Sequence, residues 1–268
     1  MRQTSLVIKA GLHNDKIERW LRPPDPSTNA NHARGLRYAG TGTWLLEHPV
    51  FLSWKAGGHQ HTWLHGLAGC GKTVLSTTLL DHLTEYEDRV LLSFFFDFSD
   101  TSKRTVDGML RSLAFQLYRT MTMATVHLDA LYRTHDDGYK QPTTEALLSV
   151  VCEMLASHKQ VTIILDALDE SINWKDLISR IKAIISRPQL GHVQLICTSR
   201  PEAEFQRNLP EIIGEENCLT IDKRAVDRDI RSYVTAQLVQ HHDFRDKNLS
   251  QDLLKEIQSK VGDGADGM

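Results

Sequence analysis

A glycine-rich stretch between an apolar run and a helical pattern constrains this chain more than any other feature. From position 61 to position 86 the sequence reads HTWLHGLAGCGKTVLSTTLLDHLTEY, and its centre matches GxxxxGK[ST] at every fixed position. The apolar run at 62–64 is too short for a helix. After the glycines, Leu75, Leu79 and Leu83 are spaced to share one face of a helix. A strand, a glycine loop and a helix in this order predict a phosphate-binding loop.

The residue types in this loop suit the binding of a polyphosphate. Gly66, Gly69 and Gly71 allow backbone conformations closed to residues with a β-carbon, so the loop's N–H groups can point inward around an anion. The ammonium group of Lys72 is expected to reach the β- and γ-phosphates, and the hydroxyl of Thr73 to ligate Mg²⁺. The residues predicted to contact ATP or ADP are Gly66, Leu67, Ala68, Gly69, Cys70, Gly71, Lys72, Thr73 and Val74.

The composition is that of an ordinary globular protein and argues against several classes of partner. Of 268 residues, 41% are hydrophobic and 24% are charged, and the net charge is -3 with histidine neutral. This balance predicts neither a nucleic-acid partner nor an anionic membrane surface. No apolar run reaches the length of a transmembrane helix, and the N-terminus lacks the apolar stretch of a signal peptide. The four cysteines are not paired at metal-binding spacing, which predicts reduced thiols and a cytoplasmic protein.

Apolar runs alternate with helical patterns along most of the chain. Strands are predicted at 62–64, 89–97, 161–165, 193–198 and 218–221. Helices are predicted from 15 to 21, across 44–54, after the glycine loop, and at about 104–121, 125–135, 143–157, 174–187, 226–241 and 249–261. Prolines at 23, 24 and 26 predict an extended linker over 22–35. Because the strands are continuously apolar, we predict an α/β fold of the P-loop NTPase type, a three-layer sandwich with a parallel sheet.

An acidic residue directly follows the apolar run VTIIL. Asp166 would stand at the carboxyl end of that strand, where parallel sheets bind their ligands. Burying an unpaired carboxylate is costly, and Mg²⁺ would supply the compensating charge. We therefore predict that Asp166 and Thr73 hold the metal. Asp169 and Glu170 are predicted to orient the attacking water, and the alternative is that they cap the following helix.

Arg200 ends the next predicted strand and completes the predicted catalytic set with Asp169 and Glu170. A guanidinium group matches phosphate well, so we predict that Arg200 senses the γ-phosphate. The alternative is a surface arginine beside a helix that starts at Pro201.

Three histidines alternate around the first predicted strand. His59, His61 and His65 are metal-ligand types, but nothing in their spacing supplies a coordination geometry, and the glycine loop follows at once. We therefore predict no metal site at these histidines.

Taken together, GLAGCGKT, IILDALDE and ICTSRPE resemble the NACHT class of STAND nucleotide-binding switches. The likeness is greatest to the fungal NLR-like proteins and to the nephrocystin-3-like N-terminal domain. The stretches RWLRPPDPSTN and GTGTWLLEHPVFLSWK are similar to the segment that precedes fungal NACHT domains. The resemblance covers about residues 15–268.

This resemblance implies a cytoplasmic ATPase switch that binds ATP or ADP with Mg²⁺, hydrolyses ATP slowly and self-associates in its ATP state. A signalling or innate-immunity-like role is expected, with an unknown downstream partner. The expected divisions are a helical lead-in at 1–55, a P-loop NTPase core at 56–222 and the start of a helical subdomain at 223–268. Family members continue into a winged helix and repeats. The last segment is therefore expected to be truncated, and the chain to be a fragment, an incomplete gene product or an isolated module.

Two other functions remain open at this stage. In the first, the chain is an interaction or assembly module that binds a nucleotide without significant hydrolysis. A P-loop kinase acting on a small molecule would use the helical region at about 98–160 as a lid, although no paired arginine cluster for a second phosphorylated substrate is visible.

Overall fold

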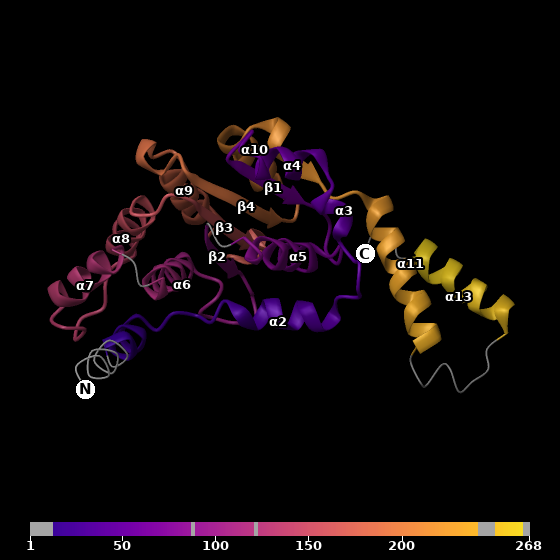
Figure 1. Cartoon of the computed structure of the whole chain (residues 1–268), viewed down its shortest axis with the longest axis horizontal. Helices are drawn as coiled ribbons and strands as arrows, with labels where there is room; N and C mark the ends of the chain where they lie inside the picture. Colours follow the sequence, from indigo (N-terminus) through magenta and orange to yellow (C-terminus); the bar gives the residue numbers. More distant parts are fainter. Residues whose placement is uncertain (1–12, 87–88, 121–122, 241–249, 265–268) are drawn as a thin grey trace.

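A five-stranded parallel sheet forms the centre of the protein (Figure 1). The computed structural model describes residues 13–86, 89–120, 123–240 and 250–264. The strands follow the order β2-β3-β4-β1-β5, and every neighbouring pair is parallel. This arrangement confirms the predicted α/β fold with a parallel sheet.

The five predicted strands are all present, with bounds that differ by a few residues at most. They are β1 (His61–His65), β2 (Val90–Phe95), β3 (Val161–Asp166), β4 (Val193–Ser199) and β5 (Cys218–Thr220). All six residues of β3 are buried, which agrees with the aliphatic character of four of them and leaves Thr162 and Asp166 as buried polar residues. The register aligns Leu165 with Cys197 and His65 with Ser199, so β3, β4 and β1 end at one edge of the sheet.

Helices cover both faces of the sheet and make it the middle of three layers. Ile163 packs in one apolar cluster and its neighbour Ile164 in another, because successive side chains of a strand point to opposite faces. The first face is covered by α6 (Val106–Arg119), α8 (Thr144–Ala156), α9 (Trp174–Ile185) and α10 (Ala203–Ile213), with α7 (Thr125–Thr134) packed on α8. The second face is covered by α3 (Thr43–Leu46), α4 (Pro49–Lys55) and α5 (Lys72–Thr84). Short 3₁₀ turns are η1 (Leu168–Glu170), η2 (Pro188–Leu190) and η3 (Glu215–Asn217).

The prediction of an extended linker over 22–35 is wrong, because most of this segment is the helix α2 (Ser27–Leu36). The prolines end the helix at 13–21, as predicted, but Pro26 then stands at the N-cap of α2. Asp25 accepts hydrogen bonds from the backbone N–H and the hydroxyl of Ser27, both at 2.8 Å, and so fixes the first turn. Ala30 and Ala33 are the buried residues of α2, which lies along α5 (Figure 1). Two alanines give only a weak helical pattern in the sequence, and the three prolines before them favoured the prediction of a linker.

The helix α10 follows Arg200, where the sequence predicts a helix starting at Pro201 only as part of an alternative and without an end. Phe205, Leu209 and Ile213 recur every four residues and bury one face of it against the sheet. Pro210 lies inside this helix, where the sequence argues for a break.

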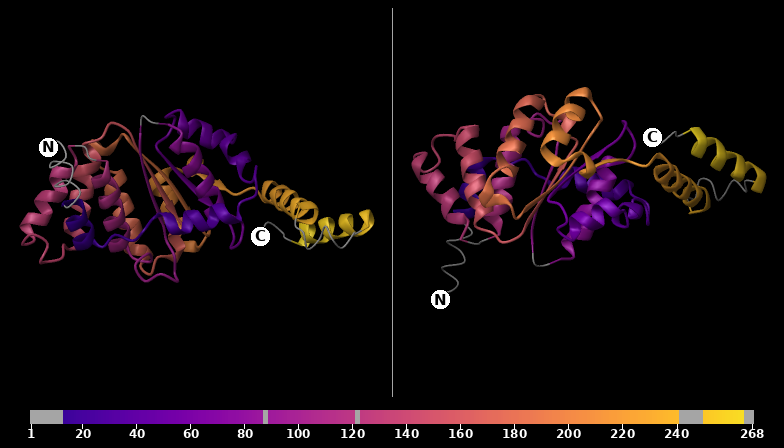
Figure 2. Two further views of the ribbon diagram at one scale, coloured as in Figure 1. Left: turned by 60° about the horizontal axis from the view of Figure 1, so that its bottom comes forward. Right: turned by 90° about the horizontal axis from the view of Figure 1, so that it is seen from above.

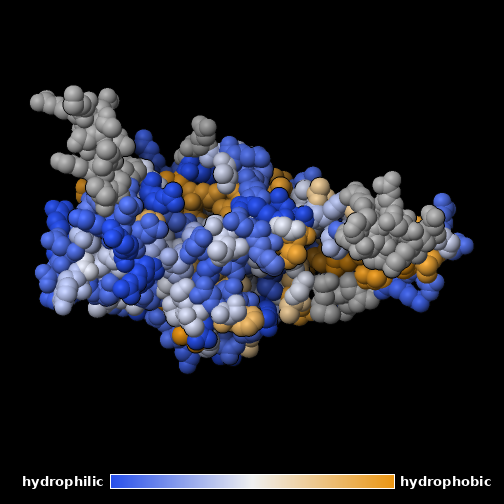
Figure 3. Space-filling model, turned by 90° about the horizontal axis from the view of Figure 1, so that it is seen from below, coloured by the Kyte–Doolittle hydropathy of each residue, from blue (hydrophilic) through white to orange (hydrophobic). Residues whose placement is uncertain are grey.

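The two C-terminal helices pack on each other and extend away from the sandwich (Figure 2). They are α11 (Lys223–Gln240) and α13 (Gln251–Gly264), and residues 265–268 of the predicted C-terminal segment lie outside the described residues. Apolar side chains gather on the surface formed by this pair (Figure 3), and Leu253 and Val261 are exposed apolar residues of α13. Within the described residues, no helix combines the length and apolar character needed to cross a bilayer.

Candidate functional site

The glycine loop joins β1 to α5 at the carboxyl edge of the sheet. Gly69 and Gly71 have φ values of 78° and 84°, which a residue with a β-carbon rarely adopts. Gly66 is required for a different reason, because a β-carbon there would lie 2.6 Å from the Sγ atom of Cys70. The loop is thus a tight turn whose end is Gly71, the N-cap of α5. A helix that begins in this way directs its free N–H groups and positive end toward an anion.

Lys72 folds back over this loop. Its Nζ atom donates hydrogen bonds to the backbone oxygens of Gly66 and Leu67, each at 2.9 Å. The ammonium group therefore lies against the backbone of the glycine loop, and its contact with the β- and γ-phosphates stays a prediction.

Asp166 is held by three hydroxyl groups at the end of β3. Thr73 and Thr198 each donate to this carboxylate at 2.7 Å, and Ser76 donates at 2.6 Å. The side chain is almost fully buried. Burial raises the pKa of Asp166, whereas the three hydroxyls and the charge of Lys72 act in the opposite direction.

The structure thus brings together Thr73 and Asp166, the two residues predicted to hold Mg²⁺. Mg²⁺ prefers hard oxygen ligands, and a hydroxyl beside a carboxylate at the foot of a phosphate loop fits that preference. Sequence reasoning missed Ser76 and Thr198. Ser76 lies one turn after Thr73 on α5, a spacing that was visible in the sequence, whereas Thr198 reaches Asp166 only through the pairing of β3 with β4.

The predicted catalytic residues Asp169 and Arg200 bind each other. The backbone N–H of Arg200 donates to one carboxylate oxygen of Asp169 at 2.9 Å, and its Nε lies 3.1 Å from the other. The Asp169 side chain is 3% exposed, whereas that of Arg200 is 46% exposed. These contacts link the end of β3 to the end of β4. Both carboxylate oxygens of Asp169 are occupied by Arg200.

Glu170 stands apart from this pair. Its carboxylate accepts a hydrogen bond from the backbone N–H of Phe98 at 3.0 Å. Burial raises the pKa of Glu170, and the nearby carboxylates of Asp169, Asp97 and Asp166 act in the same direction, against the Phe98 amide. A carboxyl with a raised pKa at the mouth of a site suits proton transfer.

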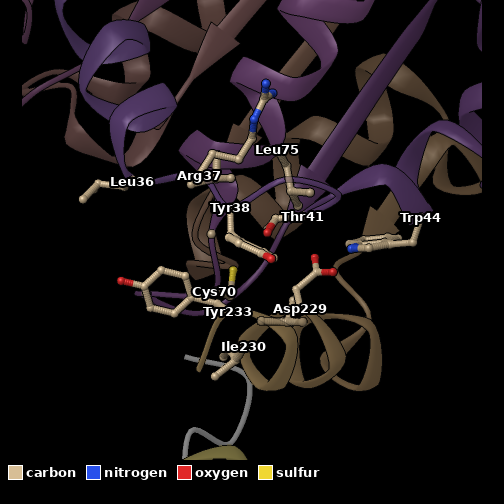
Figure 4. A pocket seen from close by; sticks show the side chains of 14 residues that line it. Leu36, Arg37, Tyr38, Thr41, Trp44, Cys70, Leu75, Asp229, Ile230 and Tyr233 are labelled. Atoms are coloured by element: carbon tan, nitrogen blue, oxygen red, sulfur yellow. The ribbon is translucent and has the colours of Figure 1, made fainter. Parts of the chain in front are cut away.

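A cavity of about 190 Å³ opens beside the glycine loop (Figure 4). Three segments far apart in the sequence form it: the lead-in around Tyr38 and Trp44, the loop with the start of α5, and α11 with Asp229 and Tyr233. The residues that line it are Leu36, Arg37, Tyr38, Thr41, Trp44, Gly69, Cys70, Gly71, Val74, Leu75, Val226, Asp229, Ile230 and Tyr233. The sequence offered no signal for this set, because its members meet only in the folded chain.

The histidines around β1 do not converge on one point. His59 hydrogen-bonds to the hydroxyl of Thr62 at 2.9 Å, and the ring of His65 packs at a tilt against Trp63 and contacts the hydroxyl of Thr220 at 3.2 Å. Across the described ranges, no group of three or more histidine, cysteine, aspartate or glutamate side chains is placed to hold a metal ion.

Comparison with known families identifies the chain. The sequence profile described as Nephrocystin 3, N-terminal, matches residues 40–200, which is more than half of the chain. The chain belongs to this family. The predicted resemblance to the nephrocystin-3-like N-terminal domain is therefore confirmed, and the match spans the glycine loop, Asp166 and Arg200.

A curated relative of this nephrocystin-3 N-terminal chain is the vegetative incompatibility protein HET-E-1 of Podospora anserina. The two are 29% identical over 218 residues, which is 76% of this chain and 15% of the relative. The chain therefore spans a small part of the length of that protein.

Solved structures resemble the chain more distantly. The Orc1 protein of Aeropyrum pernix, solved in complex with DNA, is 16% identical with a TM-score of 0.44, and the match covers 84% of this chain and 59% of that one. Domain III of the replication initiation protein DnaA from Thermotoga maritima is 15% identical with a TM-score of 0.43, covering 90% and 84%. Because both TM-scores are below 0.5, the fold assignment rests on the sheet order and the loop of this chain itself.

Proposed function

We propose that this chain is a nucleotide-binding switch module that binds ATP or ADP with Mg²⁺ and hydrolyses ATP slowly. The observation that carries the proposal is the hydrogen bond of 2.7 Å between the Thr73 hydroxyl and the Asp166 carboxylate, at the foot of the glycine loop. A phosphate loop, a lysine and a hard-oxygen pair then lie within one site at the carboxyl edge of a parallel sheet.

Each residue predicted from the sequence has a role in this proposal. The backbone N–H groups of residues 66–74 surround the phosphates, and Lys72 leaves the backbone oxygens of Gly66 and Leu67 to contact the β- and γ-phosphates. Thr73 and Asp166 hold Mg²⁺, which neutralises charge on the phosphate oxygens when it is bound. The cavity beside Gly71 takes the base, because it is mostly apolar and continuous with the loop.

Water activation falls to the acidic pair at the end of β3. Glu170 is the better placed of the two, because Asp169 already binds Arg200 through the backbone and the guanidinium group. Arg200, half exposed at the mouth, contacts the γ-phosphate and so reports its presence. Asp169 then contributes by holding Arg200 in position.

The wider role is proposed by analogy with the family. The lead-in at 1–55, the core at 56–222 and the helical segment from 223 onward would act as parts of a cytoplasmic signalling switch that self-associates in its ATP state. The packing of α2 on α5 and of α11 beside the loop supports this, because both outer parts touch the elements that hold the nucleotide.

The proposal is tested by the binding of labelled ATP to the full chain and to Lys72→Ala. We expect the substitution to weaken binding at least about tenfold, because it removes the cation that faces the phosphates. Lys175→Ala is the matched control, since Lys175 lies over the ring of Trp174 on α9, away from the loop. Equal affinity of the Lys72 variant and the unsubstituted chain would contradict the assignment.

A second candidate is a nucleotide-binding assembly module without significant turnover. The engagement of Asp169 by Arg200 favours it, because one of the two predicted water-orienting acids is not free. Phosphate release under saturating Mg-ATP separates the two functions. Release above that of the Lys72→Ala variant supports the slow ATPase, and release no faster than that variant supports the assembly module.

A further inference from the structure

The cavity beside the glycine loop is mostly apolar, and a carboxylate enters it. Leu36, Val74, Leu75 and Ile230 are among its apolar residues. Among the described residues that line the cavity, Asp229 alone carries a carboxylate. In an apolar site, a few fixed polar groups decide which ligand is accepted.

The Asp229 carboxylate is held in one orientation. Its Oδ2 atom accepts a hydrogen bond from the backbone N–H of Gly42 at 2.9 Å, which ties α11 to the lead-in. Burial raises the pKa of Asp229, whereas the Gly42 amide, the Trp44 indole and the charge of Arg228 act in the opposite direction. A carboxylate has about four acceptor positions, so the Gly42 bond leaves acceptor capacity facing the cavity.

The indole N–H of Trp44 lies beside this carboxylate. Figure 4 shows Thr41, Trp44 and Asp229 turned toward one another across the cavity. The Trp44 Nε1 atom is buried, and its N–H interacts with the Asp229 carboxylate but does not reach full hydrogen-bond geometry with any group in the described part of the chain. A fixed acceptor and an incompletely satisfied donor therefore stand side by side at one end of the cavity.

Arg37 does not neutralise this acid. Its guanidinium donates to the hydroxyl of Thr78 at 3.2 Å and pairs with Asp81 at 3.0 Å. In Figure 4 the guanidinium group points away from the cavity. The acid in the cavity thus retains its capacity to accept a hydrogen bond from a ligand.

We propose that Asp229 selects the base of the bound nucleotide by accepting a hydrogen bond from the 6-amino group of adenine. This inference rests on the proposed nucleotide binding and extends it to base specificity. Adenine presents an amino donor beside a ring-nitrogen acceptor, which is the complement of the carboxylate and the Trp44 N–H. A base without that amino group buries the remaining acceptor position of the carboxylate without a donor, which is costly.

The first test compares nucleotides on the full chain without substitution. We expect ATP to bind at least about tenfold more tightly than the triphosphate of purine riboside, which lacks the amino group. Equal binding of these two, or tighter binding of GTP than of ATP, overturns the inference while the proposed function stands. Failure of every triphosphate to bind overturns the proposed function itself.

The second test is Asp229→Asn. The Gly42 N–H still needs an acceptor, so the asparagine oxygen will turn to it and the amide NH₂ will face the base. We expect ATP to bind about tenfold more weakly and ITP, whose base carries an oxygen at that position, to bind more tightly than ATP. A variant that keeps the preference for ATP contradicts the inference.

Two controls separate base reading from a structural role. Asp227→Asn changes an acid on the same helix that does not line the cavity, and we expect its nucleotide preference to match that of the unsubstituted chain. Asp229→Ala removes both the acceptor of the Gly42 N–H and the acceptor proposed for the base. We therefore expect it to weaken the binding of ATP without making ITP bind more tightly than ATP. If Asp229→Asn does not fold, the comparison of ATP with purine riboside triphosphate still decides the matter.

Discussion

Single side chains at the carboxyl edge show how this chain tolerates a buried charge. Asp166 is compensated by three hydroxyls, and one of them, Thr198, has a second contact: its Oγ1 accepts a hydrogen bond from the backbone N–H of Ala167 at 2.9 Å. Ala167 has a φ of 55°, a left-handed conformation that a residue other than glycine rarely adopts. The Thr198 hydroxyl therefore donates a hydrogen bond to the buried Asp166 carboxylate and also holds the backbone turn at Ala167.

We expect Thr198→Val to destabilise the fold by about 1–3 kcal/mol, because it leaves the buried Ala167 N–H without its acceptor and removes one of the three hydroxyl donors to Asp166. The free energy of unfolding in urea measures this. Thr84→Val is the control, since the Thr84 hydroxyl is exposed and donates only to the backbone of its own helix. A Thr198 variant as stable as the Thr84 variant would show that Asp166 does not depend on this hydroxyl.

The two neighbouring acids at the end of β3 should differ in function. We expect Glu170→Gln to slow ATP hydrolysis at least about tenfold while ATP affinity stays unchanged, because the amide cannot take a proton from water. Asp169→Asn should instead reduce the ratio of ATP affinity to ADP affinity. The substitution removes the ion pair that positions Arg200, the residue proposed to contact the γ-phosphate. Single-turnover rates and the two binding constants separate the roles. Turnover unchanged in Glu170→Gln would mean that water activation lies elsewhere.

The pH dependence of turnover follows from the direction of the Glu170 shift. Its pKa is raised above that of an ordinary glutamate by burial and by neighbouring carboxylates. The Glu170 carboxylate must be ionised to accept a proton. The rate of ATP hydrolysis will therefore be maximal above the raised pKa of Glu170 and will fall as the pH drops through that pKa. This descending limb should disappear in Glu170→Gln, where no group titrates at that position.

Among the secondary-structure elements, α6 carries an unusual glycine. Gly108 lies in the first turn, and its N–H donates to the N-cap hydroxyl of Thr105 at 3.0 Å. A β-carbon at Gly108 would lie 1.9 Å from the backbone oxygen of Ser102. The turn at 99–104 therefore passes too close to α6 for any larger residue.

We expect Gly108→Ala to destabilise the protein by about 2 kcal/mol or more, although alanine is the better helix former. Gly35→Ala in α2 is the matched control, because nothing lies within 4 Å of the added carbon there. That change should be neutral or stabilising by up to about 1 kcal/mol. Thermal unfolding of both variants gives the comparison, and equal melting temperatures would contradict the close approach at Ser102.

Elements with a strong local pattern were predictable from the sequence, and those with a weak one were not. Four of the five residues of β3 before Asp166 are aliphatic, so the strand and the acid at its end follow from the sequence alone. The helix α2 buries only Ala30 and Ala33 and begins after prolines, so its local signals pointed to a linker. The pairing of Asp169 with Arg200 depends on β3 lying beside β4, a long-range fact that spacing along the chain does not contain.

In the molecule as a whole, one cavity joins three segments that are remote in sequence. The lead-in contributes Tyr38 and Trp44, the loop contributes Gly71, and α11 contributes Asp229 and Tyr233. The hydrogen bond between Gly42 and Asp229 is a direct tie between the first and last of these. A ligand in the cavity would add contacts to all three at once, so its binding free energy would stabilise their common arrangement.

We therefore expect Mg-ATP to slow backbone hydrogen exchange in α3, the glycine loop and α11 together. The reason is that local opening of any of these segments would lose the bound nucleotide. The helix α7 packs on α8 at the far side of the sandwich and serves as the internal reference that should not change (Figure 1). The same measurement on Lys72→Ala should show no protection at matched nucleotide concentration. Protection of the glycine loop without protection of α11 would place the base outside this cavity, because Val226, Asp229, Ile230 and Tyr233 of α11 line its wall.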